Sequence, residues 1–305
     1  MTLRIGQVGC GQWGELVLRD LKALGAHVSV VARSDLSKSR AKAQSADKIV
    51  SSIGELDSAL DGYVVVTTTD QHAPAVEALI PRGKPIFVEK ALTHDPVAAH
   101  RIVAAAGDRV FVMDKWRYHA GVEELRRLVS AGSFGKIHAL HSLRASWSMN
   151  HAELDSIWLL LPHDLAIVYH VLGAFPKPVS AHGRVLSQRG AELSAFLTGQ
   201  NGEGIHIDVS SLRPTYERKI VLVGEKATAE LGDSYARSLK FRMGSPGARD
   251  AREELLPIAD TMPLLEELRC FLAYLQGGPR PMSSAVEGTH IVETIVELRR
   301  LAGLN

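Results

Sequence analysis

A glycine-rich turn near the N-terminus constrains this chain more than any other feature of its sequence. Gly9, Gly11 and Gly14 fit the pattern G-x-G-x-x-G between the apolar run Leu3–Val8, which predicts a strand, and Gln12–Leu24, which has helical spacing. The first glycine permits a tight turn, the second lets the backbone approach a pyrophosphate, and the third allows close helix–strand packing. The helix N-terminus adds free N–H groups and a favourable dipole. The turn predicts dinucleotide binding by Gly9, Gly11, Gln12, Trp13 and Gly14. A glycine turn needed only for packing, or one from a methyltransferase, is the alternative.

The residues after the second predicted strand bear on which dinucleotide is bound. Val28–Ala32 is followed by Arg33 and Ser34, with Asp35 one step later. NAD enzymes usually carry an acidic residue about 20 positions past the glycines, where it binds the ribose 2′-hydroxyl. Arg33 can instead bridge a 2′-phosphate and Ser34 can donate to it, so the pattern favours NADP. Asp35 keeps NAD as an alternative, and Arg33 as an ordinary solvated residue is another.

The order of strand and helix patterns predicts two domains of different class. Strands alternate with helices through the first third of the chain, which predicts an α/β Rossmann domain with a doubly wound parallel sheet at residues 1–118. Later, Ile205, Ile207 and Val209 alternate with polar residues, the period of a sheet with one wet face. We expect an α+β domain with a largely antiparallel open sheet at 119–305. Packing of its C-terminal helix back on the first domain is left open.

Composition excludes several classes of partner. Lys and Arg number 35 against 34 Asp and Glu, so no broad basic surface for nucleic acid is expected. No run approaches the ~20 apolar residues of a membrane helix, so no membrane partner is expected either. Cys10 and Cys270 cannot form a disulfide scaffold, which favours a cytoplasmic protein. His163 and His170 lie two helical turns apart without an evident third ligand, so no metal is expected.

Three further motifs agree with a known family. They are Thr67–His72, the segment Phe87–Leu92 that contains Glu89-Lys90, and His163-Asp164-Leu165-Ala166. With the glycine turn, they resemble the glucose–fructose oxidoreductase/inositol dehydrogenase/MocA family, and the phrasing around His163 is closest to its sugar-nucleotide dehydrogenase-like members. The resemblance implies a nicotinamide-dependent oxidoreductase acting on a carbohydrate-like small molecule. It also implies a homodimer or homotetramer that assembles through the open face of the second sheet.

The resemblance assigns roles to individual residues. It implies that Lys90 contacts both cofactor and substrate hydroxyl, and that His163 is the acid–base group. It further implies that the cofactor is lined by Glu89, Thr67, Thr68 and His72. The other candidates for substrate binding are Arg117, Tyr118 and Arg144.

Two positions depart from the family pattern. Leu159 stands where the family has an Asp four residues before the His, and leucine cannot accept a hydrogen bond. Asp155, one helical turn earlier, is the candidate substitute. The resemblance to sugar-nucleotide dehydrogenases implies the alternative, a mechanism with Lys and His alone. Ala91 replaces the proline after Lys90, which leaves the local backbone less fixed. The expected activity is hydride transfer between NADP, or NAD, and a secondary alcohol or ketone of a sugar, cyclitol or sugar nucleotide. Its rivals are a non-catalytic cofactor-binding regulator and hydride exchange between two substrates on a resident cofactor.

Overall fold

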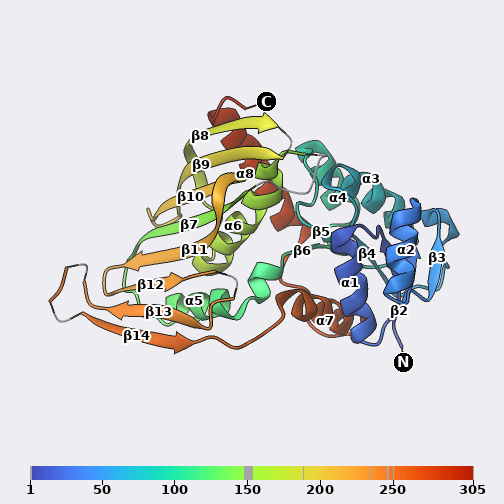
Figure 1. The fold of residues 1–305 in the computed structure, drawn as a ribbon, viewed down its shortest axis with the longest axis horizontal. Coiled ribbons are helices and arrows are strands. Elements are labelled where there is room, and N and C mark those ends of the chain that lie inside the picture. Colours follow the sequence, from blue (N-terminus) through green and yellow to red (C-terminus); the bar gives the residue numbers. More distant parts are fainter. Residues whose placement is uncertain are drawn as a thin grey trace. The chain divides into compact units, whose positions relative to one another are not determined.

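The computed structural model describes residues 2–147, 154–187, 189–233, 235–245, 247–249 and 251–304 of the chain. They form two compact units (Figure 1). The first unit comprises Met1–Lys115 and Met262–Val292, and the second comprises Trp116–Thr261 and Glu293–Asn305. Among the helices of these described residues, none has both the length and the apolar character needed to cross a bilayer.

The first unit is built on a six-stranded parallel sheet with the order β3-β2-β1-β4-β5-β6. Its strands are β1 (Arg4–Val8), β2 (His27–Val31), β3 (Lys48–Val50), β4 (Gly62–Val65), β5 (Ile86–Glu89) and β6 (Val110–Met113). Its helices are α1 (Gln12–Ala23), α2 (Asp35–Ala43), α3 (Thr69–Leu79), α4 (Pro96–Ala106) and α7 (Pro263–Leu275). The strand order reverses between β1 and β4, the position where dinucleotides bind in such sheets. The predicted Rossmann sheet is therefore confirmed.

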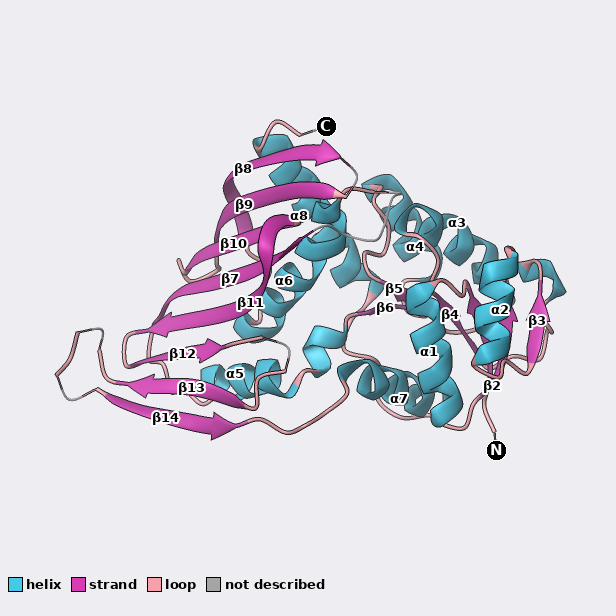
Figure 2. Ribbon diagram, viewed as in Figure 1, coloured by secondary structure: helices cyan, strands magenta, loops and turns pink. Residues whose placement is uncertain are grey.

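Helix α7 completes the core of the first unit although it comes late in the sequence. It packs beside α1, as α3 packs beside α4 (Figure 2). The ring of Phe271 stacks on that of Phe87 in β5 at a centroid distance of 4.9 Å, and Tyr274 meets Phe111 of β6 edge-on at 5.0 Å. Leu268 of the same helix is fully buried in this core. Aromatic pairs of this kind add about 0.5–1.5 kcal/mol each beyond the burial of their area.

The second unit contains an eight-stranded sheet with the order β14-β13-β12-β11-β7-β10-β9-β8, antiparallel except for the β7–β10 pair. Its strands are β7 (Ile137–Trp147), β8 (Lys177–Ser187), β9 (Gly190–Thr198), β10 (Gly204–Ser210), β11 (Leu212–Gly224), β12 (Ala227–Leu231), β13 (Ser238–Met243) and β14 (Arg252–Pro257). Its helices are α5 (Ala120–Ser130) and α6 (Ser156–Leu172), and α8 (Ala285–Leu301) begins in the first unit and ends in the second. Ile205, Ile207 and Val209 of β10 are buried, which confirms the predicted sheet with one apolar face.

Candidate functional site

The glycine turn after β1 has the geometry of a phosphate-binding cradle. Gly9 has φ +99°, and a Cβ there would lie 2.7 Å from the carbonyl oxygen of Val66. A Cβ on Gly14 would lie 2.9 Å from the carbonyl oxygen of Gly9, whereas nothing lies within 4 Å of the Cβ position of Gly11. Gly11 is also the N-cap of α1 and provides no side-chain cap for the first N–H groups. The turn thus needs glycine at two positions and leaves space and donors at the third.

A buried glutamine, Gln7, holds this turn through hydrogen bonds to its backbone. The sequence analysis did not identify it. The side-chain amide of Gln7 donates to the carbonyl oxygens of Gly9 and Gly14, both at 2.8 Å. Gln7 lies on β1 and is fully buried. Because both acceptors are backbone carbonyls of the cradle, this single side chain fixes the first and last glycines relative to each other.

Trp13 on the first turn of α1 is covered by a cation that follows the last strand of the sheet. The ammonium of Lys115, just after β6, lies 4.5 Å from the centroid of the Trp13 ring. Gln12, the neighbour of Trp13, is exposed. Lys115 was not predicted, because its pairing with Trp13 depends on a contact between residues a hundred positions apart.

Arg33 and Ser34, which lie just beyond β2, differ in how they are engaged. Ser34 caps α2, since its hydroxyl accepts the N–H of Ser37 at 3.2 Å. Arg33 is exposed. The Arg33 guanidinium is therefore at the surface near the carboxyl end of β2, whereas the Ser34 hydroxyl is already hydrogen-bonded as the N-cap of α2.

His72 ties together the loops that follow β4 and β5. Its Nδ1 lies 2.7 Å from the carbonyl oxygen of Ala91 and its Nε2 lies 3.1 Å from that of Thr67. The side chain is 1% exposed, and burial lowers its pKa to about 4. A neutral imidazole has a single N–H, and the shorter contact assigns it to Nδ1, which donates to the Ala91 carbonyl oxygen. His72 therefore holds the backbone beside Lys90, whose peptide bond to Ala91 is cis.

The remaining candidates of these loops are Thr67, Thr68 and Lys90. The Thr67 hydroxyl is buried and has no hydrogen-bond partner among the described residues. Thr68 is the N-cap residue of α3 and its side chain hydrogen-bonds with Asp70. Lys90 follows β5 directly and is partly buried. All three lie at the carboxyl ends of β4 and β5, the edge where α/β sheets bind ligands.

Three carboxyl groups gather at the same edge: buried Asp114 and Glu267, and partly buried Glu89. Burial raises the pKa of Glu89 to about 7, although Lys90 and Lys115 act in the opposite direction. Burial, and then Glu89 and Asp114, raise the pKa of Glu267 well above its usual value. Glu267 lies on α7 and was missed by the sequence analysis, because nothing local indicates that this helix returns to the first unit.

In the second unit, a buried ion pair fixes the residue next to His163. Arg144 of β7 donates from Nε to Oδ2 of Asp164 at 2.7 Å and from Nη2 to Oδ1 at 3.2 Å. The Ser142 hydroxyl also donates to Oδ1, at 2.7 Å, and the guanidinium lies 4.7 Å from the Trp116 ring centroid. Arg144 was predicted to bind a substrate anion, but its bidentate partner here is Asp164. His163 itself is partly buried on α6.

The other expected residues of this unit are also engaged within it. Arg117 is 2% exposed, and its guanidinium lies 5.0 Å from the centroid of the Tyr169 ring. Tyr118 is buried. Asp155, considered as a substitute for the missing family Asp, caps α6 and pairs with Arg299 at 2.6 Å. A carboxylate held in this way is not available to replace the acid that Leu159 lacks.

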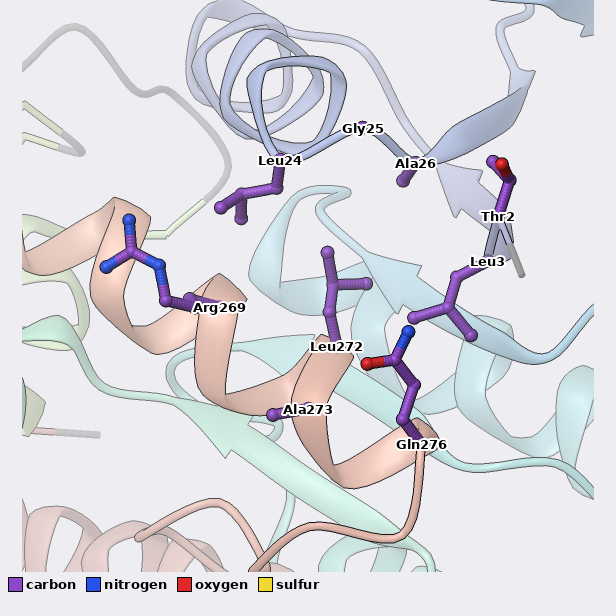
Figure 3. A pocket seen from close by; sticks show the side chains of 9 residues that line it. All are labelled: Thr2, Leu3, Leu24, Gly25, Ala26, Arg269, Leu272, Ala273 and Gln276. Carbon is purple, nitrogen blue, oxygen red and sulfur yellow. The ribbon is translucent and has the colours of Figure 1, made fainter.

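Metal-ligating side chains and cavities are two further features that could belong to the site. No group of three metal-ligating side chains lies together within the described part of the chain. A pocket of about 510 Å³ opens between the N-terminus, the turn before β2 and α7 (Figure 3). It is lined by Thr2, Leu3, Leu24, Gly25, Ala26, Arg269, Leu272, Ala273 and Gln276. Leu3 and Ala26 precede β1 and β2, so this pocket lies at the amino ends of the strands, away from the glycine cradle.

Comparison with known proteins agrees with the geometry. Residues 3–112 match the model of the oxidoreductase family GFO_IDH_MocA, described by its NAD-binding Rossmann fold. An inositol 2-dehydrogenase of Ralstonia nicotianae is 28% identical over 94% of this chain and 90% of its own length. The UDP-N-acetylglucosamine 3-dehydrogenase GnnA of Acidithiobacillus ferrooxidans shares the fold at 20% identity, with a TM-score of 0.85 over 99% of this chain and 97% of its own. A levoglucosan dehydrogenase in complex with NADH and levoglucosan shares it at 14% identity, with a TM-score of 0.86 over 99% and 98% of the two chains.

Proposed function

Since residues 3–112 match the model of the GFO_IDH_MocA oxidoreductase family, we propose that this chain is a nicotinamide-dependent dehydrogenase of carbohydrate-like molecules. Its substrate is a secondary alcohol, or the corresponding ketone, of a sugar, cyclitol or sugar nucleotide. The open cradle at Gly11, with uncapped N–H groups of α1 behind it, carries the proposal, because it fits a pyrophosphate. The relatives named above are dehydrogenases of an inositol, a UDP-sugar and levoglucosan.

Lys90 and His163 carry the chemistry in this proposal. The bound nicotinamide supplies the hydride acceptor or donor. During oxidation, the carbinol carbon gives up a hydride while the hydroxyl gives its proton to the imidazole of His163. The Lys90 ammonium orients the hydroxyl and stabilises the developing alkoxide. Support comes from the loop that His72 holds beside Lys90 and from the Arg144–Asp164 pair that fixes the residue after His163.

The lack of an acid at Leu159 favours a second candidate function. Asp155 is bound to Arg299, so this carboxylate does not take over the missing role. A regulator that binds a dinucleotide without turning over a substrate would tolerate this loss. The regulator must therefore be tested against an enzyme in which Lys90 and His163 alone carry the chemistry.

NADP is the proposed cofactor, with NAD as the alternative. Exposed Arg33 supports NADP, because a guanidinium can bind a 2′-phosphate with two parallel hydrogen bonds. The neighbouring Ser34 contributes less, since it caps α2.

We further propose a cytoplasmic homodimer or homotetramer that assembles through the open sheet face of the second unit. Phe196 on that face is 52% exposed and stacks on His206 of the next strand at 4.6 Å. A monomeric mass in light scattering would contradict this assembly.

Fluorescence titration of the cofactor-stripped protein tests the proposal first. Trp13 lies in the glycine turn, so its emission should report occupancy, and a Trp13→Phe variant controls for the other tryptophans. We expect NADPH to bind more tightly than NADH, and a panel of sugar and cyclitol ketones to be reduced. Binding without turnover of any panel member would favour the regulator, and binding of neither cofactor would overturn both functions.

A further inference from the structure

Glu267 has a position that the packing of α7 determines. Phe271 stacks on Phe87, and Glu267 lies one helical turn before Phe271 on the same face of the helix. Glu89 lies two residues after Phe87, on the same face of β5. Because Leu272 and Gln276 lie with Leu3 and Ala26 at the amino ends of the strands, α7 runs opposite to β5. One helical turn rises about 5.4 Å and two strand residues about 6.6 Å, which brings the carboxyl groups of Glu267 and Glu89 close enough to interact at the carboxyl end of the sheet.

The surroundings of Glu267 do not suit a charged carboxylate. Its side chain is 1% exposed, and its Oε2 has no hydrogen-bond partner among the described residues. The backbone N–H of Asp114 donates to the carboxyl group. The charged groups that act on it are Glu89, Asp114 and Lys115, two negative and one positive. Two neighbouring carboxyl groups, one of them fully buried, do not both ionise at neutral pH, because each disfavours the charge of the other.

We propose that Glu267 is a positioning residue which remains protonated, fixes the Asp114–Lys115 turn through the Asp114 N–H, and leaves Glu89 as the one charge of the pair. The proposal rests on the proposed dinucleotide-binding function, because Lys115 covers Trp13 of the glycine turn. Ionised Glu89 then adds one negative charge to this end of the site, and an added negative charge favours a positively charged oxidised nicotinamide over a neutral reduced one.

The pKa directions of the pair agree with this division of roles. The pKa of Glu89 rises to about 7, and burial together with the acidic neighbours Glu89 and Asp114 raises the pKa of Glu267 well above its usual value. Lys90 and Lys115 favour ionisation of Glu89, and Asp114 opposes it. Glu89 therefore loses its proton first as the pH rises, with Glu267 still neutral.

Infrared spectroscopy of the cofactor-free protein tests the proton directly. At pH 7.5, the difference spectrum between wild type and Glu267→Gln should contain the carbonyl stretch of one protonated carboxyl group. Glu266→Gln is the matched control on the same helix, where Glu266 is partly exposed and pairs with Arg269, and it should leave that band in place. A difference spectrum that shows only an ionised carboxylate would overturn the proposal, whether or not the protein binds a dinucleotide.

Cofactor binding tests the positioning role. In wild type, the ratio of the dissociation constants of reduced and oxidised cofactor should rise about tenfold as Glu89 ionises, and Glu89→Gln should abolish this step. Glu267→Gln can still accept the Asp114 N–H, so its dissociation constants should stay within about twofold and its midpoint within about half a pH unit. Glu267→Leu should weaken both cofactor forms about tenfold.

The protonation of Glu267 and its positioning role are contradicted by different results. If Glu267 were charged, Glu267→Gln would move the midpoint down by more than about one unit, because a like charge would be removed. Should Glu267→Leu not fold, the Gln variant and the infrared band still decide the proposal. If wild type binds neither cofactor, the proposed function and the positioning role both fail, while the infrared result still settles the protonation of Glu267.

Discussion

Arg144 forms a bidentate ion pair with Asp164, with Nε 2.7 Å from Oδ2 and Nη2 3.2 Å from Oδ1. The side chains are 5% and 1% exposed, so this ion pair lies inside the second unit. Because Asp164 follows His163 on α6 and Arg144 lies on β7, the pair fixes the candidate acid–base residue relative to the sheet.

Breaking this pair from one side should be costly. Asp164→Asn leaves the Arg144 guanidinium buried without its counter-ion, and we expect a loss of about 3–5 kcal/mol in the free energy of unfolding. Urea denaturation measures it. The control is Asp260→Asn, which removes a pair with Arg237 in which both side chains are 76% exposed, and should change stability by less than about 1 kcal/mol. Equal effects of the two substitutions would contradict the structural role of the buried pair.

Lys90→Met should separate chemistry from cofactor binding. The substitution removes the ammonium that we propose to stabilise the alkoxide, so turnover should fall at least about a hundredfold. The dissociation constant of NADPH should change less than about threefold, since the glycine cradle is untouched. Steady-state kinetics and Trp13 fluorescence provide the two numbers. A variant with near wild-type turnover would remove Lys90 from the mechanism.

Arg33→Ala should discriminate between the two dinucleotides. Loss of a charge-assisted contact to the 2′-phosphate should raise the dissociation constant of NADPH about tenfold. The constant for NADH should stay within about twofold, because NADH has no phosphate there. Lys42→Ala, which removes another exposed cation from α2, is the control. If both dinucleotides lose affinity equally, the preference for NADP does not depend on Arg33.

His72 should make stability depend on pH. Its folded pKa of about 4 lies below the unfolded value near 6.5, so the unfolded state binds more protons between these values. The contribution of His72 to stability is therefore lost as the pH falls from about 6.5 to about 4, by roughly 3 kcal/mol in total.

The measurement compares urea denaturation of wild type and His72→Gln from pH 7 to pH 4.5. Glu89 titrates over part of this range with the opposite sign, because its folded pKa is raised, so the difference between the two proteins isolates the histidine. Exposed His100→Gln is the control and should run parallel to wild type. Parallel curves for His72→Gln would mean that His72 is not held neutral.

Most of the fold could be predicted from local patterns in the sequence. The strand–glycine–helix pattern at Gly9–Gly14 and the alternation along β10 depend on neighbouring residues, and both predictions are confirmed by the sheets that form. The strand β3 was missed, because three residues are too few to show a period. Strand β14 was missed as well, since its exposed charged residues do not look like a strand.

The candidate site was less predictable, because its residues meet through tertiary contacts. Gln7 supports the cradle from within an apolar strand, and Glu267 reaches the sheet from a helix late in the chain. From the sequence Asp155 is a candidate substitute acid, and only the tertiary structure shows its pairing with Arg299, 144 positions away. The roles assigned to Lys90 and His163 remain predictions that the kinetic variants test.

The composition of the first unit has a consequence for how the protein is made. Its core needs Leu268 and Phe271, which leave the ribosome only after the whole of Trp116–Thr261 has been synthesised. Until then, Phe87 lacks its stacking partner and the apolar face that α7 covers stays open to solvent. A nascent chain arrested before Met262 should therefore attract chaperones and bind no dinucleotide, although every residue of the glycine turn was translated first.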